Sequence, residues 1–244
     1  MFNRTGKGAN NRSLVGGIFQ TLVGPEIGCT RHNNKEGNVK VKLETQNPLT
    51  EQSVKSATGK TWQEWFGILD KRGGTAQGRR AINDYLYGEC KLGIWWCSTI
   101  NIEYEAARSV VEKDGRPKGY TICATKTITA PVDEAYDSWV TAAALNQWFS
   151  SKNKAEVADG GRYSNADGDA GLYKRVRKNK DLRFTWENPA HTAGTIVDVV
   201  FQDKGKGKTN VMVTHDRIQT RAEADGLREG WGQALNRLKT LLEG

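Results

Sequence analysis

The sequence predicts an α+β protein in which a curved antiparallel sheet wraps around one long C-terminal helix, preceded by a separate small all-α domain. Three observations lead to this prediction. The stretch Ala224–Leu242 has the apolar period of an amphipathic helix. Alternating strand and turn signals fill residues 154–218, directly before that helix. Residues 47–112 show helical periods separated by glycines instead.

The long C-terminal helix needs an apolar surface about as long as itself, which the strands before it can supply. Its predicted inner face recurs at spacings of three and four residues and consists of Leu227, Trp231, Ala234, Leu238 and Leu241, with Leu235 and Leu242 alongside. Gly230 and Gly232 flank Trp231, and each costs about 1 kcal/mol in a helix relative to Ala. We therefore expect backbone or ligand to approach closely there and Trp231 to border a cavity.

The N-terminal residues 1–46 are rich in Gly, Asn and Lys, which predicts a disordered basic tail. Residues 1–48 hold seven Lys or Arg against three acids, so half of the net charge of +8 lies there. Because the rest of the chain is close to balanced, we expect no nucleic-acid partner.

Residues 47–112 are predicted to form a small helical domain of four helices. Their expected positions are Thr50 to Gly59, a helix capped by Thr61 and Glu64, Ala76–Tyr87 and Ile94–Val110. The polar segment Lys113–Gly119 contains two glycines and a proline and is predicted to be a linker between two separable domains.

Residues 120–244 are predicted to form the second domain, in the order strand, helix, helix, strands and long helix. The first expected elements are a strand at Tyr120–Thr129, a helix introduced by Pro131 and a helix at Thr141–Phe149. They are followed by one strand at Lys154–Tyr163 with a bulge or bend at Gly160 and Gly161, a hairpin of Leu172–Arg177 with Leu182–Glu187, and a hairpin of Thr195–Gln202 with Asn210–Arg217 around the turn DKGKGK. Sequential hairpins imply an antiparallel sheet, whose concave face the long helix must cover.

The four cysteines, at positions 29, 90, 97 and 123, form no CxxC pair and no compact disulfide framework. Reduced thiols in a cytoplasmic protein are the simplest interpretation. We expect no metal site and no cofactor. No apolar run approaches the roughly 20 residues of a membrane span, so none is expected.

Several segments of the second domain resemble one family when taken in order. They are ITAPVDEAYDSWV, NQWF, GGRY, LRFTW, VTHDRI and EGWGQALNRLKTLLE. Together they resemble the START-like (SRPBCC) superfamily, in the branch named for the activator of heat-shock protein 90 ATPase homologue. Residues 50–108 look like an uncharacterised helical domain that precedes such domains in bacterial proteins.

The resemblance implies a helix-grip fold, in which the sheet wraps the long helix and leaves an apolar cavity. Members of the superfamily bind lipids, polyketides, hormones and other hydrophobic molecules, and a minority catalyse cyclisation or dehydration. Fold alone does not choose among these activities.

The predicted cavity-lining residues are mainly aromatic: Trp148, Tyr163, Tyr173, Trp186, His215 and Trp231. Alternation places His215 on the same strand face as Val211 and Val213, where it is a general base, a ligand contact or a core residue. Ordinary packing is the alternative for each aromatic side chain. No convincing catalytic set is present.

The sequence therefore predicts a protein that binds a hydrophobic small molecule or lipid and performs no catalysis. The first alternative is a co-chaperone-like or other protein-interaction module. The second is a cyclase- or dehydratase-type enzyme acting in the cavity, which would need polar groups converging at one spot.

Overall fold

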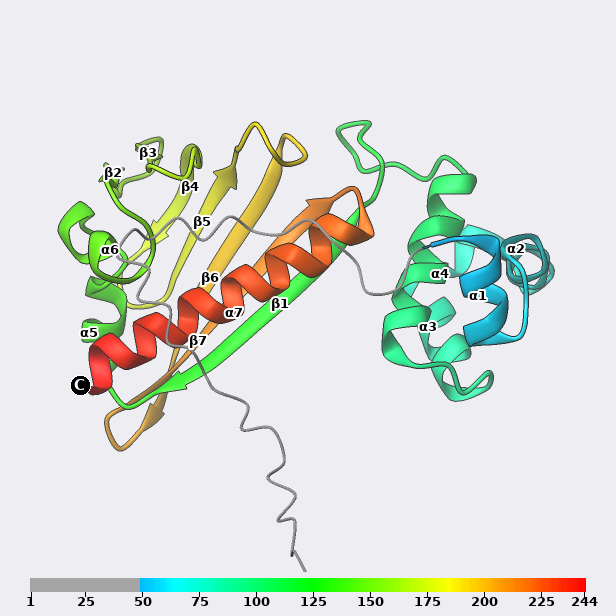
Figure 1. Cartoon of the computed structure of the whole chain (residues 1–244), viewed down its shortest axis with the longest axis horizontal. Coiled ribbons are helices and arrows are strands. Elements are labelled where there is room, and N and C mark those ends of the chain that lie inside the picture. Colours follow the sequence, from blue (N-terminus) through cyan, green and yellow to red (C-terminus); the bar gives the residue numbers. More distant parts are fainter. Residues whose placement is uncertain (1–48) are drawn as a thin grey trace, which may run out of the picture. The chain divides into compact units, whose positions relative to one another are not determined.

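The structure is a computed structural model that describes residues 49–244. The predicted disordered tail, residues 1–46, lies outside the described residues, as does Cys29. The described elements form a helical part followed by a larger α+β part (Figure 1). In chain order the helical part contains α1 (Glu51–Thr58), α2 (Trp62–Lys71), η1 (Gly74–Gln77), α3 (Gly78–Gly88) and α4 (Ile94–Ala107).

The first helix begins and ends where the sequence predicts, and the second begins where predicted. Thr50 caps α1, which ends at Gly59 in the left-handed conformation, and Thr61 caps α2 together with Glu64. In the structure, α4 ends at Ala107, three residues before the end of the predicted fourth helix. The core of this part is built from residues of all four α-helices: Val54, Trp65, Leu69, Ile82, Leu86, Cys97, Ile100 and Tyr104.

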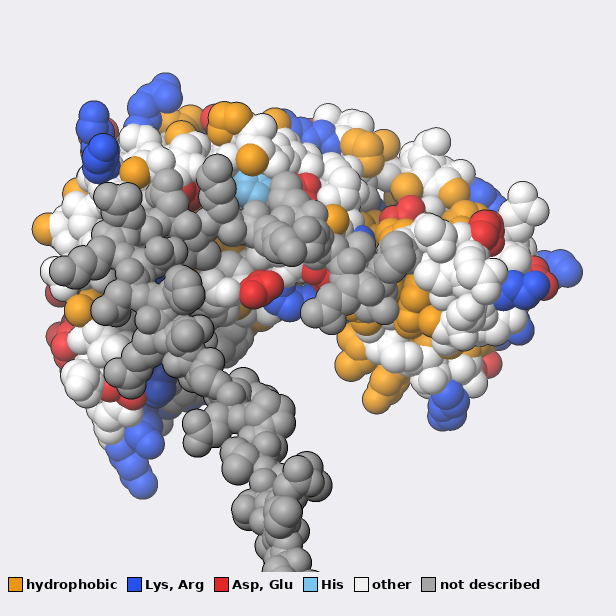
Figure 2. Space-filling model, viewed as in Figure 1, with side chains coloured by type: hydrophobic (Ala, Val, Ile, Leu, Met, Phe, Trp, Pro, Cys, Tyr) orange, Lys and Arg blue, Asp and Glu red, His pale blue; other side chains and the backbone are white. Residues whose placement is uncertain are grey.

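Polar contacts add to this helical core. Tyr104 donates to Asp70 Oδ1 at 2.5 Å, and Arg108 forms an ion pair with the same carboxylate. Figure 2 shows hydrophobic side chains on the surface as well. The most exposed large ones in this part are Ile94 at 71% and Tyr87 at 59%.

The α+β part has the element order that the sequence predicts. Its elements are β1 (Tyr120–Ile128), α5 (Val132–Asp137), α6 (Ala142–Trp148), β2 (Lys154–Ala155), β3 (Arg162–Ser164), β4 (Ala170–Arg177), β5 (Asp181–Trp186), β6 (Thr195–Gly205), β7 (Lys208–Ile218) and α7 (Arg221–Glu243). The strands form an antiparallel sheet in the order β1-β7-β6-β5-β4-β3-β2, and α7 lies across one face of it (Figure 1). The predicted helix-grip fold is confirmed.

The sheet face under α7 is apolar because alternate residues of each central strand point toward the helix. These buried residues are Leu182, Phe184 and Trp186 on β5, Val197, Val199 and Phe201 on β6, and Val211, Val213 and His215 on β7. Register shifts interrupt the pairing of β1 with β7 and of β4 with β5. Such irregularities increase local twist, which fits a sheet that curves around a helix.

Two strand predictions were wrong in detail. Lys154–Tyr163 is not one strand but two short strands, β2 and β3, that pair with each other. The chain turns between them: Gly160 has φ +82°, and a Cβ on Gly161 would lie 2.0 Å from the Glu156 carbonyl oxygen. The turn DKGKGK is also tighter than predicted, since only Lys206 and Gly207 separate β6 from β7 and both have positive φ.

The prediction for the long helix was wrong in three details. It starts at Arg221 rather than Ala224, because Thr220 caps it by accepting from the Glu223 amide. Leu241 is 38% exposed, whereas Leu242 packs against the core. A Cβ on Gly232 would meet no protein atom within 4 Å, so close backbone approach does not explain that glycine.

Candidate functional site

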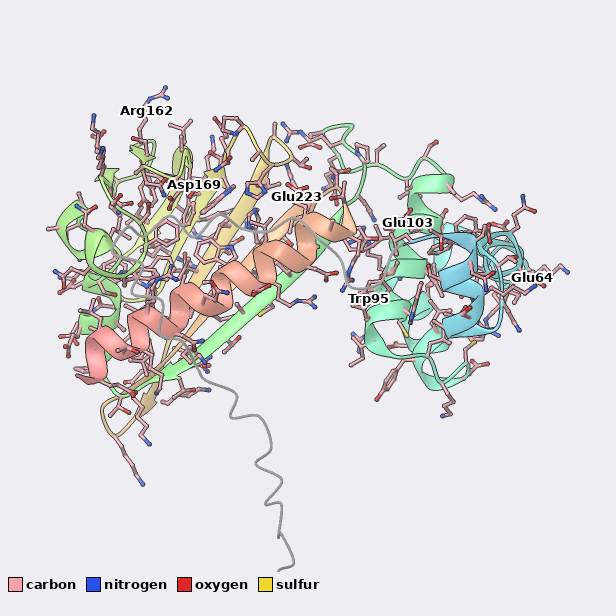
Figure 3. All side chains as sticks on the ribbon, in the orientation of Figure 1. Glu64, Trp95, Glu103, Arg162, Asp169 and Glu223 are labelled. Carbon is pink, nitrogen blue, oxygen red and sulfur yellow. The ribbon has the colours of Figure 1, made fainter. Side chains whose placement is uncertain are left out.

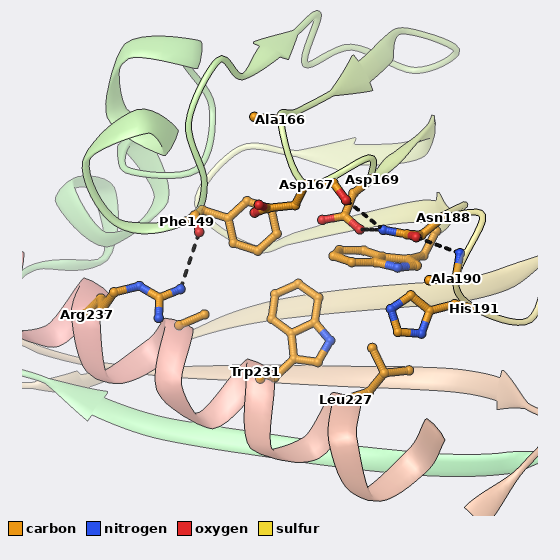
Figure 4. A pocket seen from close by; sticks show the side chains of 13 residues that line it. Phe149, Ala166, Asp167, Asp169, Asn188, Ala190, His191, Leu227, Trp231 and Arg237 are labelled. Atoms are coloured by element: carbon orange, nitrogen blue, oxygen red, sulfur yellow. Dashed lines mark hydrogen bonds between the residues drawn. The ribbon is translucent and has the colours of Figure 1, made fainter. Parts of the chain in front are cut away.

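A pocket of about 390 Å³ opens between α7, the end of α6 and two loops of the sheet (Figure 4). One loop precedes β4, and the other connects β5 with β6. The lining residues are Phe149, Ala166, Asp167, Asp169, Trp186, Asn188, Ala190, His191, Leu227, Gly230, Trp231, Ala234 and Arg237. The pocket thus joins an apolar floor, from the helix and sheet, to a polar side supplied by the loops.

Trp231 is the centre of the apolar floor and is 3% exposed. Its ring stacks on Phe149 at a centroid distance of 5.6 Å and on Trp139 at 6.2 Å, with interplanar angles of 17° and 15°. The Trp186 ring meets it edge-on at 5.3 Å. Such offset and edge contacts are the favourable geometries for aromatic rings, so Trp231 belongs to the core and borders the pocket at once.

His215 is fully buried behind this floor and has both ring nitrogens occupied. Trp231 Nε1 donates to His215 Nδ1 at 3.2 Å, and His215 Nε2 lies 2.9 Å from Thr195 Oγ1. Because an indole N–H can only donate, Nδ1 must accept and Nε2 carries the proton. Burial lowers the pKa of His215 to about 3. The geometry therefore holds a neutral imidazole with one fixed tautomer, without a nitrogen free for a ligand.

Glu223, in the first turn of α7, holds the loop between β5 and β6 against the helix. Its Oε1 accepts from the Thr192 amide at 2.5 Å and its Oε2 from the Thr192 hydroxyl at 2.6 Å. Burial by itself would raise the pKa of Glu223, but His191 and the Thr192 donors outweigh burial and lower it. This clamp positions His191, whose side chain is 6% exposed with Nδ1 3.6 Å from Glu223 Oε1.

Asp169 supplies a buried carboxyl group to the polar side of the pocket. Asn188 Nδ2 donates to its Oδ1 at 2.7 Å and Asn165 Nδ2 to its Oδ2 at 3.0 Å. Burial raises the pKa of Asp169 despite these two hydrogen bonds. Figure 3 shows that Asp169 and Glu223 come from elements far apart in sequence, a loop of the sheet and the start of α7.

Arg237 closes the other end of the pocket. Its Nε donates to the Trp148 carbonyl at 2.7 Å and its Nη2 to the Phe149 carbonyl at 3.3 Å. Burial lowers the pKa of the guanidinium group. These bonds satisfy carbonyl groups at the C-terminal end of α6, and they hold Phe149 against Trp231.

The structure brings two of the six predicted site residues, Trp186 and Trp231, to the pocket. His215 lies directly behind it, and Trp148 faces Trp139 at 4.6 Å instead. Tyr163 and Tyr173 form an aromatic cluster with Phe184, and Tyr163 borders a separate, more open hollow over β3 and β4. The prediction did not include the other lining residues, above all Phe149, Asp169, His191 and Arg237.

Within residues 49–244, no group of three His, Cys, Asp or Glu side chains could hold a metal ion. None of the helices in the described part of the chain combines the length and apolar character that a membrane crossing needs. Cys90, Cys97 and Cys123 are free thiols.

Comparison with known proteins finds a family match in the α+β part. Residues 129–243 match the family model described as Activator of Hsp90 ATPase homolog 1-like protein. No curated protein matches the chain.

Similar solved structures include three that each cover about half of this chain. CalU16 from Micromonospora echinospora is 20% identical with a TM-score of 0.46, over 50% of this chain and 75% of that chain. PFC0360w, an HSP90 activator from Plasmodium falciparum, is 17% identical with a TM-score of 0.47, over 51% of this chain and 97% of that chain. The Aha1 dimer from Colwellia psychrerythraea is 20% identical with a TM-score of 0.46, over 51% and 96%.

The family match covers the strand, helix and sheet elements that build the pocket, from the end of β1 to the end of α7. Residues 129–243 of this chain therefore match the Activator of Hsp90 ATPase homolog 1-like family.

Proposed function

We propose that the C-terminal domain binds a hydrophobic small molecule in the pocket between α7 and the sheet, without catalysing a reaction on it. The observation that carries this proposal is the 390 Å³ pocket with Trp231, Phe149 and Trp186 around it. Small-molecule sites in proteins typically have volumes of roughly 300–1,000 Å³ and mainly apolar linings with a few polar groups. The size favours a ligand of a few rings over a long-chain lipid.

The proposal is limited to binding because of how the pocket histidines are held. His215 uses both ring nitrogens for protein partners, so it has no nitrogen available for proton transfer. His191 faces the pocket with its Nδ1 3.6 Å from Glu223 Oε1, which is longer than a hydrogen bond. A general base is usually oriented by a hydrogen bond, which favours binding over catalysis.

The two alternatives keep specific support. Asp169 and His191 are both buried on one side of the pocket, so polar groups converge there. This convergence supports the enzyme alternative more strongly than the sequence alone. The family supports a protein partner, since one similar structure is described as an HSP90 activator. A cytoplasmic location and the division into domains at 47–112, 113–119 and 120–244 stay predictions.

Filling the pocket tests the proposal. Ala234 is 2% exposed and lines the pocket, so Ala234→Trp should occupy the space that a ligand needs. The wild type should bind the neutral fluorophore N-phenyl-1-naphthylamine with a rise in fluorescence, and A234W should bind it at least about tenfold more weakly, the loss of about 1.4 kcal/mol of binding free energy.

Gln233→Trp is the matched control, because Gln233 is the preceding residue on α7 and is exposed. Q233W should bind the fluorophore like the wild type. Absence of binding by the wild type, or equal binding by A234W and wild type, would reject this pocket as the ligand site. Association of an unliganded wild type with a chaperone ATPase would then bring the protein-interaction alternative forward.

A further inference from the structure

We propose that the ligand of this pocket carries a positively charged group, a protonated amine or an alkylammonium, which the Asp169 carboxylate receives beside the aromatic floor. This inference rests on the proposed function and adds the chemical class of the ligand to it. The apolar body of the ligand would lie against Trp231 and Phe149, and its cationic group would face the loops (Figure 4).

Asp169 is a buried carboxylate that forms no ion pair with a Lys or Arg of the described residues. It is 7% exposed, and its hydrogen bonds come from the neutral amides of Asn165 and Asn188. Burial raises its pKa, although the two amides and the nearby His191 act in the opposite direction. Buried charges in proteins are normally paired. A ligand cation would supply the missing partner.

Each oxygen of Asp169 also has room for another donor. An ionised carboxylate offers about four acceptor positions, whereas Asn165 and Asn188 occupy one on each oxygen. The ammonium group of a ligand can therefore bind without displacing either amide. Hydrogen bonds between two charged groups are shorter and stronger than those between neutral groups.

The other charges around the pocket also favour a cation. Asp167 adds a second carboxylate to the lining, and Glu223 stands behind His191. Arg237 is the Arg of the lining among the described residues, and its Nε and Nη2 donate hydrogen bonds to the Trp148 and Phe149 carbonyls. The acid that raises its pKa is Asp167 rather than Asp169. A carboxylate ligand would meet repulsion here, whereas a cation would be attracted.

Aromatic rings line the same pocket as the acid. Trp186 and Trp231 border the same pocket as Asp169. Indole faces attract cations within about 6 Å of the ring, most strongly where water is excluded. Trp and a carboxylate together thus fit an ammonium group better than a neutral polar group.

His191 is an independent sign that the polar side is built for a ligand. Its side chain is 6% exposed, yet its Nδ1 makes no hydrogen bond among the described residues, since Glu223 Oε1 lies 3.6 Å away. A buried polar atom without a hydrogen bond is costly. A polar atom of the ligand could hydrogen-bond to this nitrogen while the charge pairs with Asp169.

Three probes with one ring system test the charge preference by isothermal titration calorimetry at pH 8, where alkylamines are protonated and carboxylates ionised. They are 2-(aminomethyl)naphthalene, 2-naphthalenemethanol and 2-naphthoate. The wild-type chain should bind the amine about 10- to 100-fold more tightly than the alcohol, the range for a hydrogen bond between charged groups. It should bind the naphthoate most weakly.

Asp169→Asn removes the charge with little change in shape, and Asp133→Asn is the control, because Asp133 is exposed on α5 and does not line the pocket. D169N should bind the amine and the alcohol with equal affinity, while D133N should keep the preference of the wild type. Circular dichroism verifies that both variants fold. The comparison of the three probes on the wild type decides the sign of the preference even if D169N does not fold.

The outcomes separate the two proposals. Equal binding of amine and alcohol, or tightest binding of the naphthoate, overturns the cationic ligand and leaves the hydrophobic pocket in place. A preference for the amine that persists in D169N overturns the role of Asp169. Failure of the wild type to bind any of the three probes removes the proposed function and this inference with it.

Discussion

Replacing Trp231 tests whether one side chain serves the core and the pocket together. Trp231→Ala removes the ring that stacks between Phe149 and Trp139 and deletes the donor to His215 Nδ1. Truncating a buried Trp to Ala typically costs about 3–5 kcal/mol. The loss should approach the upper end, because a buried acceptor without its donor adds to the cost of the cavity.

Trp231→Phe separates the two contributions. Phenylalanine keeps an aromatic ring between Phe149 and Trp139 but lacks the N–H that His215 accepts. Leaving a buried acceptor unsatisfied costs about 1–3 kcal/mol, so W231F should lie clearly between the wild type and W231A in stability.

Urea unfolding at pH 7, followed by circular dichroism, measures both losses from the transition midpoints, provided that the slopes agree. N-phenyl-1-naphthylamine binding by the folded variants reports on the pocket. A loss below about 1 kcal/mol for W231A would refute the core role of the ring, since large losses accompany core truncation. Unchanged probe affinity in W231A would refute its place at the pocket.

Three further predictions concern His215, the long helix and the linker. Burial lowers the pKa of His215 to about 3, so between pH 6.5 and that value only the unfolded chain takes up a proton on this residue. His215 alone should therefore make the free energy of unfolding fall by about 1.4 kcal/mol for each pH unit below pH 6.5. His215→Gln should flatten this slope in urea titrations between pH 6.5 and 4.5, and identical slopes would contradict the buried neutral imidazole. Gly232→Ala should raise the free energy of unfolding by about 0.5–1 kcal/mol, since a Cβ there meets no protein atom; a loss of stability would show that the position is crowded. Trypsin should cut after Lys113, which is exposed, and within residues 1–46; initial cuts within β5 or β6 instead would contradict the predicted domain boundary.

Periodicity predicted most of the fold because packing follows it in this domain. Alternation on β5, β6 and β7 places Trp186, Val199 and Val213 on the buried face, and the spacing of Leu227, Trp231 and Leu238 defines the buried face of α7. Where the pattern was weak, the prediction was wrong. Glycines at 160 and 161 split a predicted strand because they allow a turn that alternation cannot reveal.

The pocket itself was less predictable, for a physical reason. Asp169, Asn188 and His191 stand on loops, where no period assigns a direction to a side chain, and only the folded sheet brings them to α7. The alternation of the strand predicted which face of the sheet His215 lies on. It could not predict that Trp231 would donate a hydrogen bond to His215 Nδ1. Tyr173 has the expected buried environment, yet it lies at another position along the sheet.

One signal in the sequence could have pointed to the loops. The segment ENPAHTAG places a histidine between two strands, and NADGD precedes β4 with two acids. Both stretches follow or precede strands whose aromatic residues face the long helix. Side chains at the ends of such strands can reach a cavity at the edge of the helix, as Asp169 and His191 do.

The central claim is that the space beside Trp231 receives one small hydrophobic molecule. Native mass spectrometry of the wild type and A234W, each incubated with N-phenyl-1-naphthylamine, tests it most directly. We expect one bound fluorophore per wild-type chain and none on A234W, with both chains folded. A wild type that stays at its bare mass, or equal occupancy of both proteins, would contradict it.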